Sequence, residues 1–260
     1  VIGLEYGEGF SRSFNASATD MPNGQASLSN GIAQAVGGYN YASRSWAWLA
    51  QAQYSYKGRY IVSASVRYDE TSRFAPKARG GYFPGASAAW IINKEDWMQN
   101  QSTVSLLKLR AGWGQQGNQS GLADYAWVQQ YGTNYYDWTN KDYADATPTL
   151  GGKSNIGNKD LTWETTTQTN VGIDWSMFNS RLVVRLDGYY KYTKNLLMNV
   201  PLPSPYPSIY RNEGEMSNWG LELAVNSVNI EKNGWSWTTD FNISMNRNML
   251  EKLDLQQVYY

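Results

Sequence analysis

The chain has 260 residues, with 22 Lys and Arg against 22 Asp and Glu, and it contains no His and no Cys. Balanced charge gives no basic surface for phosphates, so we expect no nucleic-acid partner. Without His or Cys there is no disulfide, thiol nucleophile, Ser-His-Asp triad or imidazole ligand for a metal, so we predict no catalytic site, no metal and no cofactor, and hence no enzyme.

The N-terminal residues show no basic segment followed by an apolar one, so no signal peptide is visible, and no apolar run of about 18 residues predicts a membrane helix. From there on, hydrophobicity alternates with period two. Between residues 60 and 68, for example, Tyr60, Val62, Ala64 and Val66 alternate with mostly polar residues. Such alternation is typical of strands with one apolar and one polar face. It predicts no helix and about nine strands. These strands are expected near residues 2–9, 46–56, 60–68, 82–92, 107–113, 163–175, 182–192, 219–225 and 235–245.

These strands fit either a soluble sandwich or a membrane barrel, because both separate apolar from polar faces. Two features favour the barrel. The clearest runs have about 11 to 13 residues, which exceeds the usual soluble strand and suits a tilted membrane strand. Aromatic residues also bracket the apolar faces, as Trp163 and Trp175 do, in a chain with 12 Trp and 20 Tyr. Membrane interfaces favour such rings at both ends of an apolar band.

The connections alternate between tight turns and long loops, which is the outer-membrane barrel pattern of short periplasmic turns and long extracellular loops. We expect the long loops near residues 11–45, 69–80, 116–161 and 194–217. Because single-chain bacterial barrels close with an even number of strands, nine strands predict an arc of a larger barrel. We therefore treat residues 1–260 as one partial β-barrel domain.

Five stretches, in order along the chain, resemble the SusC/RagA family of TonB-dependent outer-membrane transporters of Bacteroidota. Residues 68–74 and 79–90 are similar to its R-D-G-S-S-R-F and G-x-F-P-x-x-S-x-x-W motifs, with Glu70 where the family usually has Gly. Residues 107–118 are similar to L-K-L-R-x-x-Y-G-x-x-G-N. Residues 161–174 are close to L-x-W-E-x-x-x-x-x-N-x-G-x-D, and residues 212–222 to N-x-G-x-x-x-N-x-G-x-E.

The resemblance implies a transmembrane antiparallel β-barrel of about 22 strands, in contact with outer-membrane lipid, whose plug domain and TonB box we do not find in this chain. It also implies import of an oligosaccharide, or alternatively a peptide as in the RagA type. The implied partners are a SusD-like surface lipoprotein and the TonB complex, which would act through the missing plug.

Two sets of residues are candidates for function. The first consists of charged residues that we expect on the inner wall, where they serve wall structure more readily than substrate binding: Lys108, Arg110, Glu164, Asp174, Arg185, Asp187, Glu222 and Asp240. The second consists of loop aromatics beside Asn, Gln and Asp, which suit sugar rings or a partner surface: Trp127, Tyr131, Tyr135, Tyr136, Trp138 and Tyr143.

Two other functional classes stay open at this stage. A passive porin needs the same wall without a plug. An outer-membrane enzyme needs a general acid and base at the extracellular rim, which without His must be carboxylates, and no close pair of them is found at a strand end.

Overall fold

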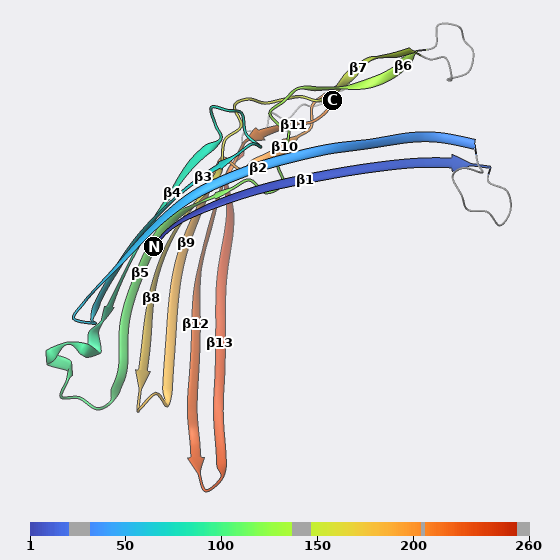
Figure 1. Ribbon diagram of the computed structural model, residues 1–260. Coiled ribbons are helices and arrows are strands. Elements are labelled where there is room, and N and C mark those ends of the chain that lie inside the picture. The colour runs from blue at the N-terminus through green and yellow to red at the C-terminus, as the bar shows by residue number, and fades with distance from the viewer. Residues whose placement is uncertain (21–31, 137–146, 204–205, 254–260) are drawn as a thin grey trace.

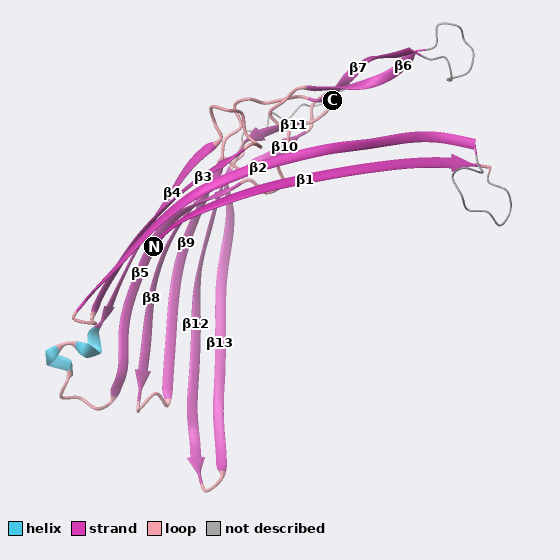
Figure 2. Ribbon diagram, viewed as in Figure 1, coloured by secondary structure: helices cyan, strands magenta, loops and turns pink. Residues whose placement is uncertain are grey.

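The computed structural model describes residues 1–20, 32–136, 147–203 and 206–253 (Figure 1). Within these ranges nearly every ordered element is a strand. The helices there are two single 3-10 turns, η2 (Ile92–Lys94) and η3 (Asp96–Met98) (Figure 2). Neither turn has the length or the apolar character needed to cross a membrane.

Nine strands form one antiparallel sheet in the order β1-β2-β3-β4-β5-β8-β9-β12-β13, which confirms the predicted all-β class and strand number. Their bounds are β1 Ile2–Thr19, β2 Ile32–Tyr56, β3 Tyr60–Thr71, β4 Gly80–Ile91, β5 Val104–Asn118, β8 Glu164–Met177, β9 Leu182–Lys194, β12 Glu215–Lys232 and β13 Trp235–Lys252. Two small two-stranded sheets lie in the connections: β6 (Gln130–Tyr136) with β7 (Thr147–Asn155), and β10 (Leu197–Val200) with β11 (Ile209–Asn212).

The prediction of a long loop at residues 11–45 is wrong, because strands occupy most of this range. β1 continues to Thr19 and β2 begins at Ile32, and the two strands pair along this whole length as a hairpin that extends past the other strands of the nine-stranded sheet (Figure 1). The period-two signal fades there because neither face of the extension needs to be apolar once it has left the apolar band of the sheet. The other three long connections begin and end within three residues of the predicted bounds, and two of them contain the small sheets.

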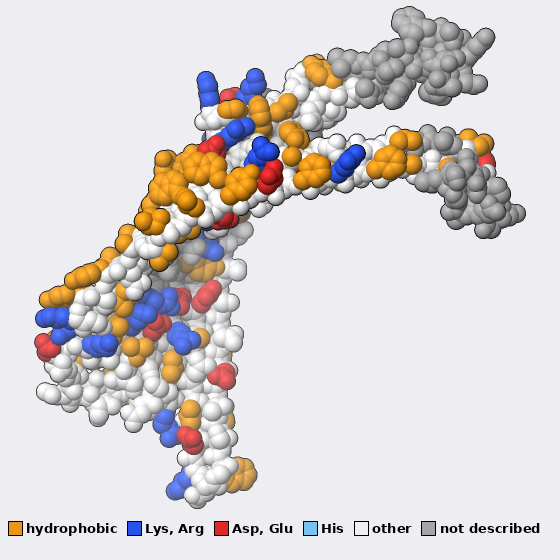
Figure 3. All heavy atoms as spheres, viewed as in Figure 1, with side chains coloured by type: hydrophobic (Ala, Val, Ile, Leu, Met, Phe, Trp, Pro, Cys, Tyr) orange, Lys and Arg blue, Asp and Glu red, His pale blue; other side chains and the backbone are white. Residues whose placement is uncertain are grey.

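The register of the sheet places apolar and polar side chains on opposite faces. On what we call the outer face, Val62 lies opposite Ala88, Ala111 opposite Val171, and Val184 opposite Val225. On the other, inner face, Ser63 lies opposite Ser87. Figure 3 shows charged side chains gathered in the hollow of the sheet and hydrophobic ones along its outside. The sheet is therefore a curved wall with an apolar outside.

Aromatic rings form a row at each end of the outer face. Toward the long loops, the rings of Trp48 and Tyr82 both contact Tyr68, with the Tyr68 and Tyr82 centroids 4.7 Å apart. Toward the short turns, Tyr60 and Trp90 stack at 6.3 Å. Rows of amphipathic rings on both sides of an apolar band match the two interfaces of a bilayer.

At the short-turn end, a buried carboxylate joins the β2–β3 turn to the β4–β5 turn. Glu95 lies between the two 3-10 turns and is 8% exposed. It accepts hydrogen bonds from the Arg59 guanidinium at 2.6 Å and from the Trp90 indole at 2.9 Å. Hydrogen bonds from Tyr60 and Trp90, together with Arg59, lower the pKa of Glu95 from 4.5 to about 2. The ionised carboxylate thus stabilises the folded short-turn end.

We expect this cluster to make stability depend on acid pH. A carboxylate whose pKa is lower in the folded state contributes stability that is complete above pH 4.5 and is lost as the pH falls toward 2. The unfolding midpoint should therefore fall more steeply over this range in the wild type than in Glu95→Gln. Urea unfolding in lipid vesicles at several pH values would measure both slopes, with Asp96→Asn as a control that leaves Glu95 in place. Equal slopes for wild type and Glu95→Gln would contradict this assignment.

The β8–β9 turn holds three consecutive non-glycine residues in the left-handed region, because Phe178, Asn179 and Ser180 have φ values of 54°, 55° and 66°. This conformation costs most L-residues roughly 1–2 kcal/mol each, and Asn somewhat less. Ser180 has compensating contacts, since its hydroxyl accepts a hydrogen bond from Ser176 and its amide donates to Ser105. Asn179 makes no side-chain hydrogen bond in the described structure.

Replacing Asn179 by glycine should therefore stabilise the protein by about 0.5–1 kcal/mol, because glycine adopts positive φ without strain. The same substitution at Asn242, within strand β13, should destabilise by a similar amount, because a strand interior disfavours glycine. Urea unfolding of both variants checks the prediction. Loss of stability in both variants would show that the turn is not strained.

Candidate functional site: the inner wall and its loop platform

The eight charged residues predicted on the inner wall do share the inner face, by strand register. Four of them form a connected network. Asp174 lies 3.4 Å from both Lys108 and Arg110, and Arg110 reaches Asp187 at 2.6 Å. Positive and negative charges thus balance within this part of the wall, which lies toward the short turns.

Gly172 makes this network possible, because it lies between β5 and β9 where Arg110 crosses to Asp187. A Cβ atom at Gly172 would lie 2.5 Å from the Asp187 carboxylate and 2.8 Å from the guanidinium carbon of Arg110. A real Cβ does not approach other atoms so closely. Glycine at position 172 therefore leaves room for the Arg110–Asp187 ion pair on the inner face, and it does not form a turn.

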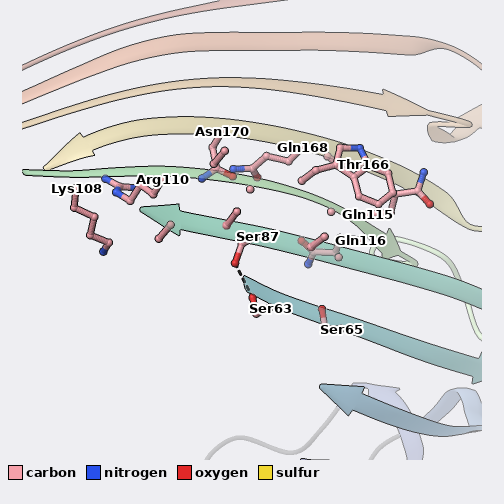
Figure 4. A pocket seen from close by; sticks show the side chains of 18 residues that line it. Ser63, Ser65, Ser87, Lys108, Arg110, Gln115, Gln116, Thr166, Gln168 and Asn170 are labelled. Atoms are coloured by element: carbon pink, nitrogen blue, oxygen red, sulfur yellow. Dashed lines mark hydrogen bonds between the residues drawn. The ribbon is translucent and has the colours of Figure 1, made fainter. Parts of the chain in front are cut away.

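Next to the charged network, the inner face is hollowed into a groove of about 560 Å³ (Figure 4). Lys108 and Arg110 of the charged network line the groove together with uncharged residues that carry hydroxyls and amides: Ser63, Ser65, Ser87, Gln115, Gln116, Thr166, Gln168 and Asn170. The groove is deep because no side chains project into it at Gly85 and Gly114, which pair with each other, or at Gly112 on the same strand as Gly114. Ser63 and Ser87 share a 2.6 Å hydrogen bond across β3 and β4. The groove therefore offers many hydrogen-bond donors and acceptors, and its two cations are paired with Asp174 and Asp187.

At the long-loop end, segments far apart in the sequence pack into a small apolar core above the wall. We call this core the loop platform and define it by four buried residues: Phe74, Leu122, Ala126 and Leu161. Trp163, Leu197 and Tyr210 pack against it. Phe74 and Leu161 are the largest fully buried side chains in the described part of the chain. The long connections are therefore fixed to one another.

Polar contacts reinforce the loop platform at its edges. Arg73 pairs with Asp124 at 2.9 Å and so joins the β3–β4 loop to the β5–β6 loop. Asn158 donates to the Tyr210 carbonyl at 2.8 Å, which joins the β7–β8 loop to β11. Asn155, the last residue of β7, donates to the Val128 carbonyl at 2.8 Å. The base of the β6–β7 hairpin is thus anchored to the platform.

The aromatic loop candidates do not form one cluster in the described structure. Trp127 is half-buried, and its indole donates to the Ser72 carbonyl at 3.2 Å, so it holds two loops together. Tyr131 is 47% exposed at the start of β6, where its hydroxyl accepts a hydrogen bond from Gln129. The backbones of Tyr135 and Tyr136 pair with β7, but their side chains, like all of Trp138 and Tyr143, lie outside the described residues. Their role in binding stays a prediction.

Sequence reasoning missed the groove as a candidate site. Gln168 and Asn170 were recognisable as polar positions of their strand, by alternation alone. Their meeting with Ser63 and Gln116 depends on the pairing register of four strands. No single strand carries that information.

The comparisons with known proteins agree on one family. The chain matches the family described as "TonB dependent receptor-like, beta-barrel" over residues 1–252. It is 35% identical over 206 residues to TonB-dependent receptor P39 of Formosa agariphila, and the aligned residues cover 78% of this chain and 19% of that protein. It is 31% identical over 222 residues to TonB-dependent receptor SusC of Bacteroides thetaiotaomicron, which covers 82% and 22%. The chain thus spans about a fifth of the length of these relatives.

The wall also matches the solved structure of the RagAB peptide transporter. The TM-score is 0.85 at 26% sequence identity, covering 97% of this chain and 28% of that one. The agreement extends over nearly all of the curved sheet, so the wall described above has the shape of the corresponding part of that structure.

Proposed function

This chain belongs to the TonB-dependent receptor β-barrel family, whose members are receptors and transporters, and we propose that it forms part of the wall of an outer-membrane nutrient importer of the SusC and RagA type. The observation that carries this proposal is the sheet itself. It combines an apolar outer face between two aromatic rows with an inner face that is hollow and polar and carries a network of ion pairs. Such a wall separates lipid from an aqueous interior.

In this proposal the wall closes into a barrel of about 22 strands with further strands beside β1 and β13, because a bilayer does not tolerate an open strand edge. A plug fills the barrel and connects to the TonB complex, and a SusD-like lipoprotein covers the extracellular side. The protein resides in the outer membrane of a Bacteroidota-like bacterium and transports its substrate without chemical change.

We propose an oligosaccharide as the substrate, because the groove is lined by hydroxyls and amides and a sugar presents hydroxyl groups that both donate and accept. A peptide is the second candidate, favoured by the likeness to the RagAB peptide transporter. A passive pore, which needs no energy input, is the third.

Uptake by living cells tests the function. In the native bacterium, deletion of the gene should abolish uptake of one oligosaccharide class, and deletion of TonB should abolish it equally. Uptake that survives loss of TonB would indicate a passive pore. Loss of peptide uptake alone would favour the peptide importer.

A further inference from the structure

The inner face holds a second pocket, at the long-loop end and directly beneath the loop platform, with a volume of about 730 Å³. We call it the rim pocket and define it by Arg67, Asp69, Phe83, Gln116, Gln119 and Trp163. We infer that the rim pocket is a binding subsite for a neutral sugar unit of the transported substrate. This inference rests on the proposed function and assigns binding to the wall instead of to the aromatic loop.

The charges of the rim pocket favour a neutral ligand. Arg67 is held by Asp69, which accepts from its Nε at 2.8 Å, and by Glu5, which accepts from Nη2 at 2.9 Å. Two carboxylates against one guanidinium disfavour an anionic ligand. The Nη1 group of Arg67 has no acceptor within the described residues, so it can donate to a ligand hydroxyl.

Two glutamine side chains add amide groups to the wall of the rim pocket. The Oε1 atom of Gln119 is buried, yet it accepts no hydrogen bond from the described part of the chain. Buried polar atoms are nearly always paired, so Gln119 is an incompletely satisfied side chain in the wall of the pocket. Gln116, two strand positions beyond Gly114, adds an exposed amide on the same pocket. A ligand hydroxyl in the pocket can accept from Arg67 and donate to the exposed Gln116 amide, because a hydroxyl carries both functions.

Two aromatic rings also line the rim pocket. Phe83 and Trp163 meet edge to face with centroids 5.5 Å apart. Phe83 has room to lie against the wall only because Gly81 and Gly117 have no side chains there. The Trp163 indole is held in place by its hydrogen bond to the Arg79 carbonyl at 2.9 Å and is partly exposed. Because Phe83 is buried, the partly exposed Trp163 ring supplies the aromatic surface, and such a surface beside polar groups suits the C–H face of a sugar ring.

The test compares binding by the complete transporter, purified with its lipoprotein partner. Titration calorimetry would use maltohexaose, cellohexaose and laminarihexaose as neutral probes, hexagalacturonate as an anionic probe and a tryptic casein digest as a peptide probe. The double variant Gln116→Leu/Gln119→Leu removes both amides at similar size. Gln53→Leu makes the same change on the inner face of β2, outside the rim pocket, and serves as the matched control.

We expect one neutral hexasaccharide to bind, the double variant to weaken its binding by about tenfold or more, and Gln53→Leu to bind like wild type. Unchanged binding by the double variant would overturn the subsite. Binding of only hexagalacturonate or only peptides, or of no probe at all, would overturn the neutral-sugar assignment. Failure of the importer itself is recognised separately, because uptake would then persist without TonB.

Discussion

Substituting arginine for Val171 should destabilise the protein by about 2–4 kcal/mol and reduce the amount assembled in the membrane. Val171 lies near the middle of β8 on the outer face, where it is 56% exposed and lies opposite Ala111 and Gly188. If the outer face were in water, an arginine at such an exposed position would change the stability of the protein little. Against lipid, the guanidinium must be desolvated at the depth where that costs most.

The neighbouring inner face supplies the matched control. Gln168 is on the same strand, three residues away and on the opposite face, where it lines the groove. Gln168→Arg should change stability by less than about 1 kcal/mol, as substitutions in solvated sites usually do. Both variants can be compared by urea unfolding in lipid vesicles and by the amount of folded protein in outer-membrane fractions. Equal losses in the two variants would mean that the outer face does not contact lipid.

The sequence was sufficient to predict the faces because lipid and water impose opposite requirements on adjacent residues. Alternation along β8 therefore assigns Val171 and Gln168 to opposite faces without reference to any other strand. The rule stops applying where both faces meet water. The extension of β1 to Thr19 and of β2 back to Ile32 consequently looked like a loop.

The candidate sites could be predicted from the sequence less well than the faces of the strands. Trp127 looked like a binding residue because its neighbours in sequence are polar and aromatic, but its indole is used to hold Ser72 of a distant loop. The groove and the rim pocket each draw side chains from at least three strands. Which residues become neighbours across strands depends on register, and the hydrophobic pattern fixes register only to within an even number of residues.

The loop platform carries the second large prediction. Leu161→Ala should remove about 2–5 kcal/mol from the local stability of the platform, because Leu161 is fully buried against Phe74 and the other members of the core. Leu161→Met, which preserves volume, should cost less than about 1.5 kcal/mol. Since the strands below keep their own hydrogen bonds, the loss should be confined to the connections that the platform joins.

Amide hydrogen exchange of the folded protein separates these effects. In Leu161→Ala, residues 119–129 and 156–163 should exchange faster, while the centres of β5 and β8 should keep their protection. Faster exchange throughout the sheet would mean that the platform supports the whole wall, and unchanged exchange would mean that the loops are held by polar contacts such as Arg73–Asp124 alone. Because the platform roofs the rim pocket and anchors the base of β6–β7, the expected local loosening should also weaken substrate binding without preventing assembly of the protein in the membrane.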